Sequence, residues 1–198
     1  MSPDALLSLV AFAAASTISP GGATALATAS GAHFGFRRSV PLLAGIAIGL
    51  ASLAAAAAAG LAAAVLAVPA LGLAMRLAGT AYLLWLALRF ATSGAPRLDG
   101  ALERPRSLAG GALLICYNPK AWAMTLGAAA SFSGLADSPL ALAAILGLVF
   151  GAAAMAALSF WCAAGLMLAR LLTSERQWAV LNGLLAALLV LSIGPMWL

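Results

Sequence analysis

The sequence predicts an all-α integral membrane protein that crosses the bilayer six times and has no sizeable soluble domain. Of its 198 residues, 65% are hydrophobic and 8% are charged. Soluble domains carry about 25% charged residues, and a soluble chain of this size could not cover this much apolar surface. Its 20 glycines suit closely packed membrane helices. The pairs Gly45/Gly49 and Gly147/Gly151 are GxxxG motifs, which favour close helix crossings within one subunit or in a homodimer.

Six apolar stretches are long enough to cross a bilayer, which requires about 20 residues. They cover residues 5–30, 40–68, 73–91, 108–132, 140–171 and 178–198. The fifth is long for one span at about 1.5 Å per residue, so it must tilt, project or bend. We therefore predict a single transmembrane domain over residues 1–198. Its three-span halves, at about 1–92 and 106–198, are joined by a cytoplasmic loop at 93–105.

Basic residues predict the orientation of these spans. They occupy the connections after the first, third and fifth spans, at Arg37, Arg38, Arg97, Arg104, Arg106, Arg170 and Arg176. The N-terminus and the other two connections carry Asp4 and Asp137 instead. Because cytoplasmic loops are enriched in Lys and Arg, both termini are expected outside, in the periplasm. Arg76 is the exception, and it lies close enough to the end of its span to reach the interface.

The first and fourth spans contain helix-breaking motifs at matching positions. Ser19-Pro20-Gly21-Gly22 lies near the middle of the first span, and Asn118-Pro119-Lys120 lies near the middle of the fourth. Each half has an odd number of spans, so the second half enters the membrane from the opposite side. We therefore expect two inverted three-helix repeats with interrupted helices 1 and 4. This arrangement places a binding site near the bilayer midplane.

The prolines should free main-chain groups at both breaks. Proline removes a backbone donor, so Pro20 should free the carbonyl of Ser16 and Pro119 that of Ile115. Lipid cannot satisfy such groups, so protein, water or a ligand must do so. The glycine pair after Pro20 adds backbone freedom. Freed carbonyls can bind an ammonium group and freed amides a carboxylate, which are the two ends of a zwitterion; a simple kink is the alternative for either proline.

Lys120 is the only lysine in the chain and the only charge near the centre of a span. A central lysine costs about 2.5–3.5 kcal/mol on insertion scales, which indicates a use. Its ammonium could meet a substrate carboxylate. Alternatively, burial could favour release of its proton, so that it binds and releases a proton during transport. Snorkelling, or capture by neighbouring carbonyls, would give it no such role.

Other polar side chains are candidates for the same site, namely Ser16, Thr24, Tyr82 and Tyr117. The hydroxyls of Ser16 and Thr24 could instead bond back to their own helix, and the tyrosines could simply pack. The predicted substrate-binding set is Ser16, Ser19, Pro20, Gly21, Gly22, Thr24, Tyr82, Tyr117, Asn118, Pro119 and Lys120.

No cofactor, metal site or catalytic centre is expected. All five acidic residues lie in termini or connections, so no buried carboxylate is available for a proton relay or a hard cation. Cys116 and Cys162 lie in apolar stretches without metal-binding or redox spacing. The net charge of +5 is spread over the connections and forms no basic face for nucleic acid. The chain is therefore not predicted to be an enzyme.

Four motifs follow one another in a specific order. The first two are Ser19-Pro20-Gly21-Gly22, and Gly35-Phe36-Arg37-Arg38-Ser39 with Leu43-Ala44-Gly45. The others are Ala78-Gly79-x-x-Tyr82-Leu83-x-Trp85-Leu86 and Asn118-Pro119-Lys120-Ala121-Trp122. Together they resemble the LysE/RhtB family of bacterial amino-acid exporters. The first motif is usually Thr-Pro-Gly-Pro in that family; here Gly22 replaces the second proline, and Ala23 replaces an Asn or Asp that often follows.

The resemblance implies six spans, export of small amino acids or their derivatives, and energy from the proton gradient. It also implies functional roles for Asn118, Pro119 and Lys120, and the cysteine and O-acetylserine exporters look like the nearest subgroup. The resulting hypothesis is a secondary transporter of the bacterial inner membrane that works by alternating access. Its partners would be a small amino acid, protons and the lipid bilayer. A non-transporting membrane scaffold or assembly protein is the alternative.

Overall fold

The computed structural model describes residues 3–61 and 107–191, with isolated positions between 70 and 92 and at 193. Most of the predicted third span, the connection at 93–105 and the end of the sixth span lie outside the described residues. All regular elements in the described ranges are helices, which confirms the predicted all-α class.

Within the described ranges, two continuous helices are long and apolar enough to cross a membrane. α3 spans Phe36–Ala56 and continues into a π-helical turn, η1, at Ala57–Leu61, while α8 spans Pro139–Leu171. α8 has 33 residues. At about 1.5 Å per residue it is about 50 Å long, well beyond a hydrocarbon core of about 30 Å, so it tilts or projects. Leu140, Leu148 and Met167 are exposed on α8, as expected for a helix that faces lipid.

The two predicted breaks are present in the structure. The first span consists of α1 at Pro3–Ile18 and α2 at Gly22–Phe34, which are bent by 59° relative to each other. The fourth consists of α6 at Leu108–Cys116 and α7 at Pro119–Ser131. Pro119 lies in the first turn of α7, where the missing N–H has no intrahelical acceptor to lose. A short 3-10 turn, η2 at Ser133–Leu135, leads to α8, and α9 spans Glu175–Leu191.

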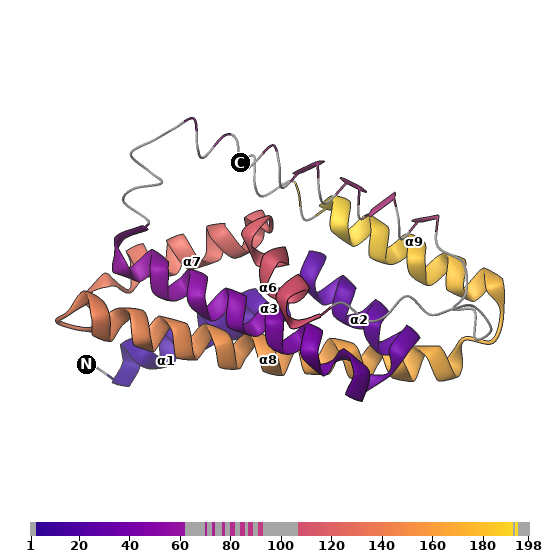
Figure 1. The fold of residues 1–198 in the computed structure, drawn as a ribbon, viewed down its shortest axis with the longest axis horizontal. Helices are drawn as coiled ribbons and strands as arrows, with labels where there is room; N and C mark the ends of the chain where they lie inside the picture. Colours follow the sequence, from indigo (N-terminus) through magenta and orange to yellow (C-terminus); the bar gives the residue numbers. More distant parts are fainter. Residues whose placement is uncertain are drawn as a thin grey trace.

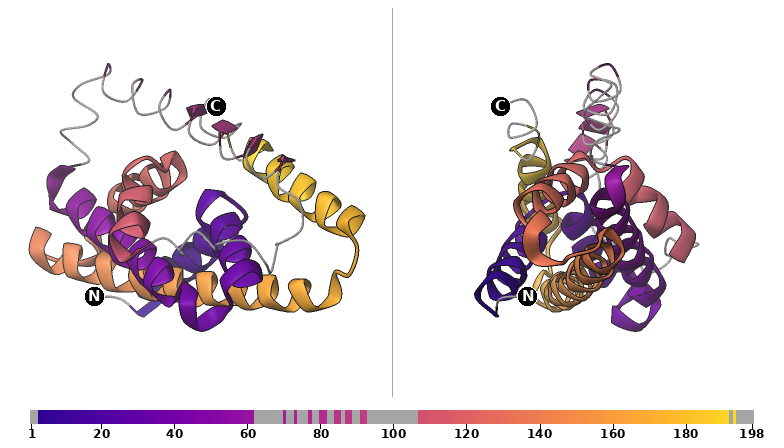
Figure 2. Two further views of the ribbon diagram at one scale, coloured as in Figure 1. Left: turned by 45° about the vertical axis from the view of Figure 1, so that its right-hand side comes forward. Right: turned by 90° about the vertical axis from the view of Figure 1, so that its left-hand side faces the viewer.

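The central pair of helices is α3 and α8, which pack against each other along the long axis of the molecule (Figure 1). α8 also packs along α1 and α2, and α3 also packs along α6 and, less extensively, α7. Viewed end-on, α8 lies between α1 and α3 (Figure 2). Fully buried side chains such as Leu9, Leu43 and Phe150 join these three helices. α9 packs beside α2, where Leu185 and Leu189 meet Ala25.

Glycines allow the helices to cross at backbone contact. Where α2 crosses α8, Gly31 lies against the backbone of Cys162, and Gly165 lies against that of Thr28. A Cβ atom at either glycine would overlap a carbonyl oxygen of the other helix. The main chains of α2 and α8 can approach this closely only because these positions lack side chains.

Both GxxxG motifs are used inside the chain. Gly45 and Gly49 contact the backbone of α6, and Gly147 and Gly151 contact Ala51 of α3. The intramolecular alternative therefore accounts for these motifs. A homodimer stays a prediction.

Gly31→Ala should destabilise the protein, because its Cβ overlaps the Cys162 carbonyl oxygen. Relieving such overpacking typically costs about 1–3 kcal/mol, so the thermal unfolding midpoint of the purified protein should fall. Gly127→Ala is the matched control, since its added Cβ has nothing within 4 Å. Its midpoint should stay unchanged or rise, because Ala favours helix over Gly. Equal midpoints for Gly31→Ala and the wild type would contradict the close α2–α8 crossing.

Candidate functional site

Thr24 shapes the break between α1 and α2. Its Oγ1 accepts a hydrogen bond from the Gly21 N–H at 2.8 Å and donates one to the Gly21 carbonyl oxygen at 2.9 Å. This side chain therefore caps α2, which begins at Gly22. Its hydroxyl is used for local structure. The next amides, of Gly22 and Ala23, belong to the first turn and have no intrahelical acceptor.

Asn118 shapes the break between α6 and α7. Its Oδ1 accepts a hydrogen bond from the Lys120 main-chain N–H at 3.2 Å, and the residue is only 5% exposed. Because the accepting atom must be the oxygen, the side-chain NH₂ group lies on the other side of the amide. That NH₂ group has no acceptor among the described residues.

Lys120 connects the two breaks. Its Nζ donates hydrogen bonds to the Ser19 carbonyl oxygen at 2.6 Å and to Ser19 Oγ at 2.7 Å. A third, longer contact of 3.4 Å reaches the Pro20 carbonyl oxygen. Three oxygens thus meet the three donors of one ammonium group. The segments around residues 20 and 119 meet, as the hypothesis of a shared site requires.

Gly21 leaves the space through which Lys120 reaches these oxygens. A Cβ atom at Gly21 would lie 3.3 Å from Lys120 Cδ and 3.4 Å from its Nζ. The two residues hold equivalent positions, because each directly follows the proline of its motif. The lysine of one motif therefore lies over the glycine of the other.

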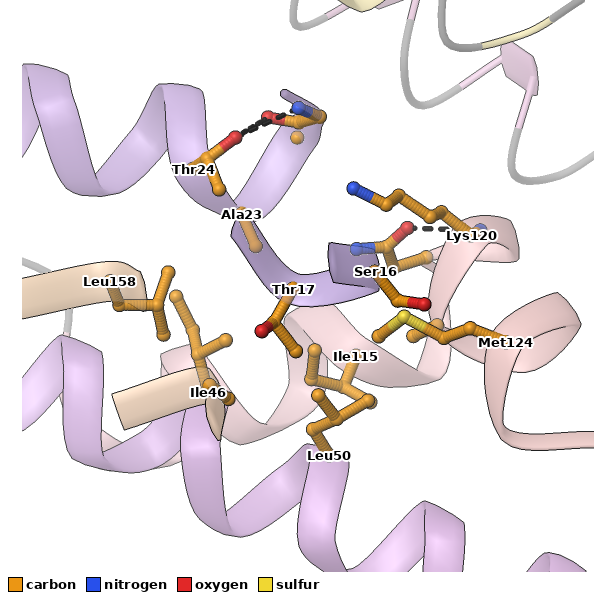
Figure 3. Close-up of a pocket in the computed structure, with 15 residues that line it drawn as sticks. Ser16, Thr17, Ala23, Thr24, Ile46, Leu50, Ile115, Lys120, Met124 and Leu158 are labelled. Carbon is orange, nitrogen blue, oxygen red and sulfur yellow. Dashed lines mark hydrogen bonds between the residues drawn. The ribbon is translucent and has the colours of Figure 1, made fainter. Parts of the chain in front are cut away.

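A cavity lies beside this contact (Figure 3). Its polar groups come from the two broken spans, and α3 and α8 add the apolar side chains Ile46, Leu50 and Leu158. Figure 3 shows Lys120 extending from α7 toward the start of α2, with these apolar side chains on the opposite side. The space open to the centre of a water-sized sphere is about 30 Å³, which is room for about two water molecules. An amino acid would require the lining helices to separate.

The structure brings most of the predicted site residues to this cavity. Those that line it are Ser16, Gly21, Gly22, Thr24, Asn118 and Lys120. Ser19 and Pro20 contribute the oxygens that accept hydrogen bonds from the lysine ammonium.

Two predicted residues do not line the cavity, and a third is not described by the structure. Pro119 is buried at the start of α7 and does not line the cavity. Tyr117 is also not among the lining residues, and its side chain is 57% exposed. Tyr82 lies outside the described residues.

The carbonyls that the prolines free have hydrogen-bond partners within the chain. The Ser16 carbonyl oxygen accepts a hydrogen bond from Ser19 Oγ at 2.9 Å, and that of Ile115 accepts one from the Asn118 N–H at 3.1 Å. Both groups are therefore satisfied by the protein within their own break, which is one of the three predicted alternatives. The oxygens that bind a cation belong to Ser19 and Pro20.

Hydroxyl groups of the first span fall into two classes. Thr17 and Thr28 donate to carbonyls of their own helices, at Ala13 and Thr24, over 2.8 and 2.9 Å. These bonds follow the back-bonding pattern usual for helical threonine. Ser16 and Thr17 both line the cavity, but the Ser16 hydroxyl differs because it has no hydrogen-bond partner among the described residues.

One family of known proteins matches this chain over a range that includes both breaks and every residue that lines the cavity. Residues 14–194 match the LysE type translocator family. The chain belongs to this family. Comparison with curated proteins and with solved structures gave no match. Membership confirms the resemblance seen in the motifs and, with the apolar helices, makes this chain a membrane translocator.

Two tryptophans of the translocator bind helix ends that the breaks leave open. Trp161 Nε1 on α8 donates to the Ile18 carbonyl oxygen at 2.9 Å, and Trp122 Nε1 donates to that of Cys116 at 3.0 Å. Ile18 and Cys116 end α1 and α6, and the last carbonyls of a helix lack intrahelical donors. Sequence reasoning gave neither tryptophan this role. Trp122 is close to its break in sequence, whereas Trp161 has no local signal.

Thr24→Val should weaken the start of α2 in the LysE family translocator. Valine keeps the shape of the side chain but can neither accept from the Gly21 N–H nor donate to its carbonyl. Loss of a helix cap costs about 0.5–2 kcal/mol, so the thermal unfolding midpoint should fall. Thr24→Ser retains the hydroxyl and should stay close to the wild type. A valine variant as stable as the wild type would show that this hydroxyl does not shape the break.

Proposed function

We propose that this translocator is a secondary transporter that exports small amino acids or their derivatives across the bacterial inner membrane, with both termini outside. The observation that carries the proposal is the contact of the Lys120 ammonium with the Ser19 and Pro20 oxygens, beside a cavity. It supports a site that is shared by two broken helices, the arrangement in which transporters bind polar solutes.

Packing of the described helices supports six spans in two inverted halves. α8 packs along the broken span α1–α2, α3 packs along the broken span α6–α7, and α3 and α8 pack on each other. The second span of each half thus contacts the interrupted first span of the other half. In Figure 1, α1 and α2 lead away from the end at which the N-terminus lies, whereas α7 leads back toward it. Opposite directions are what an inverted repeat requires.

Transport proceeds by alternating access around this cavity. The space beside Lys120 is too small for an amino acid, so binding requires the surrounding helices to separate. The Lys120 contact ties α7 to the α1–α2 break. Movement of one half against the other must therefore strain or release this contact. Substrate binding and helix movement act on the same group.

Proton coupling uses the same amine. Lys120 is the one titratable side chain among the described residues that line the cavity. Among the described acidic residues, Asp4 and Glu175 lie in the first turns of α1 and α9 and Asp137 lies before α8, and none of them lines the cavity. A neutral amine has lost its charge and one of three donors, so release of the proton weakens the contact with Ser19 and Pro20. Proton release and separation of the two halves then favour each other.

Lys120→Met should slow export strongly, and Lys120→Arg should separate substrate binding from proton coupling. Hydrogen bonds to charged groups contribute about 1.5–3 kcal/mol, so transport should fall by about tenfold to a hundredfold in the methionine variant. Arginine keeps the charge but does not release its proton. It should exchange substrate across the membrane yet fail to accumulate it against a gradient. The measurement is uptake of radiolabelled alanine, serine, cysteine and O-acetylserine into inverted membrane vesicles, with and without an uncoupler.

Arg176→Met is the matched control, since it removes an exposed positive charge at the start of α9. It should transport like the wild type. A wild-type rate in Lys120→Met would remove the lysine from the mechanism. Absence of amino-acid uptake by the wild type, with the protein present in the membrane, would contradict the export function and favour a scaffold.

A further inference from the structure

We infer that the site binds its substrate through the carboxylate and does not require the substrate's ammonium group. This inference rests on the proposed transport function and extends it, because it names the recognised chemistry. The substrate class is small carboxylic acids without a net positive charge, with or without an amino group. Free amino acids are one part of this class.

The oxygen-lined part of the site is already filled by the protein's own ammonium. Lys120 Nζ lies 2.6 and 2.7 Å from the two oxygens of Ser19 and 3.4 Å from the Pro20 carbonyl oxygen. The preceding carbonyl, that of Ile18, accepts from Trp161 Nε1 at 2.9 Å. A substrate ammonium would have to displace Lys120 from its partners. A substrate carboxylate does not compete with Lys120 for these oxygens.

The cavity instead presents hydrogen-bond donors that have no acceptor among the described residues. The Asn118 side chain is 5% exposed, and its oxygen is used by the Lys120 main-chain N–H. Its NH₂ group has no acceptor among the described residues. A buried donor without an acceptor costs about 1–3 kcal/mol, and a ligand oxygen would remove this cost. The Ser16 hydroxyl, also without a partner in the described part of the chain, can donate to the same ligand.

The start of α2 faces the cavity from the other broken span. α2 has 13 residues, and its first two, Gly22 and Ala23, line the cavity. Their N–H groups have no intrahelical acceptors, and the positive end of the helix dipole favours an anion there. Thr24 uses only the Gly21 amide. Main-chain donors of α2 and the buried Asn118 amide thus point to one anionic ligand group between them.

The charge and shape of the other lining residues determine which further groups the substrate can carry. Lys120 is the only charged residue that lines the cavity in the described part of the chain, so the local potential is positive. A cation on the substrate would lie near the Lys120 ammonium without a carboxylate of the protein to pair with, which is unfavourable in a partly buried site. Ile46, Leu50 and Leu158 form the apolar side (Figure 3), where a short apolar substituent fits.

Four small probes test this assignment on the purified full-length protein in lipid nanodiscs. L-Alanine has both charged groups, propionate has only the carboxylate, L-alaninamide has only the amine, and L-lysine has an extra cation. A ligand that binds the folded state raises the thermal unfolding midpoint. At equal concentration and ionic strength, L-alanine and propionate should raise it by similar amounts, and L-alaninamide and L-lysine should leave it unchanged.

Asn118→Asp tests the role of Asn118, because it replaces the side-chain NH₂ donor with a negatively charged carboxylate oxygen in a side chain of the same shape. It should lose the response to L-alanine and propionate. Asn182→Asp is the matched control, since Asn182 is the only other asparagine and lies on α9, outside the cavity lining. It should keep both responses.

The inference is overturned if L-alaninamide stabilises the protein as well as L-alanine does, or if propionate has no effect. A full response in Asn118→Asp also overturns it. These results would leave export itself intact, since vesicle uptake measures export separately. If vesicles take up no amino acid while propionate still stabilises the protein, the proposed substrate fails but the carboxylate site stands.

Discussion

A charged amine within a membrane span needs oxygen partners, and for Lys120 they come from a helix about 100 residues earlier in the chain. Its ammonium is hydrogen-bonded to both oxygens of Ser19 and lies near the Pro20 carbonyl. These oxygens are exposed only because the first span is interrupted there. The lysine in turn would be costly in lipid without them. The break and the lysine therefore depend on each other, and the cavity lies where they meet.

The remaining helices hold this contact in place. α3 and α8 pack against each other and each lies along one broken span. Glycines such as Gly31 and Gly165 let α8 reach the backbone of α2, and Trp161 of α8 closes the end of α1 through the Ile18 carbonyl. The broken span is thus fixed on both sides of its break. The two sides of the break differ in what they contact. The oxygens of Ser19 and Pro20 are hydrogen-bonded to Lys120, whereas the first amides of α2 face the cavity.

Local chemistry in the sequence was sufficient to predict the breaks, the long fifth helix and the meeting of the two motifs. Proline lacks an N–H wherever it occurs, so its effect on Pro20 and Pro119 needs no knowledge of the fold. The identity of the free oxygens could not be predicted in the same way. It depends on Ser19 turning its hydroxyl back to the Ser16 carbonyl, which is a choice of side-chain rotamer. Trp161 contacts Ile18 across 143 positions, and no local pattern indicates such a contact.

The most direct test of the account is a distance between Lys120 Nζ and the Ser19 carbonyl carbon. The chain has one lysine, so ¹⁵Nζ-lysine gives one side-chain signal in solid-state NMR. With a hydrogen bond of 2.6 Å and a C=O bond of about 1.23 Å, the two atoms lie within about 3.8 Å. Serine labelled at the carbonyl carbon should therefore dephase the lysine signal in lipid bilayers, whereas labelled valine, absent from the cavity lining, should not. A lysine signal unaffected by labelled serine would contradict the contact on which the proposed site depends.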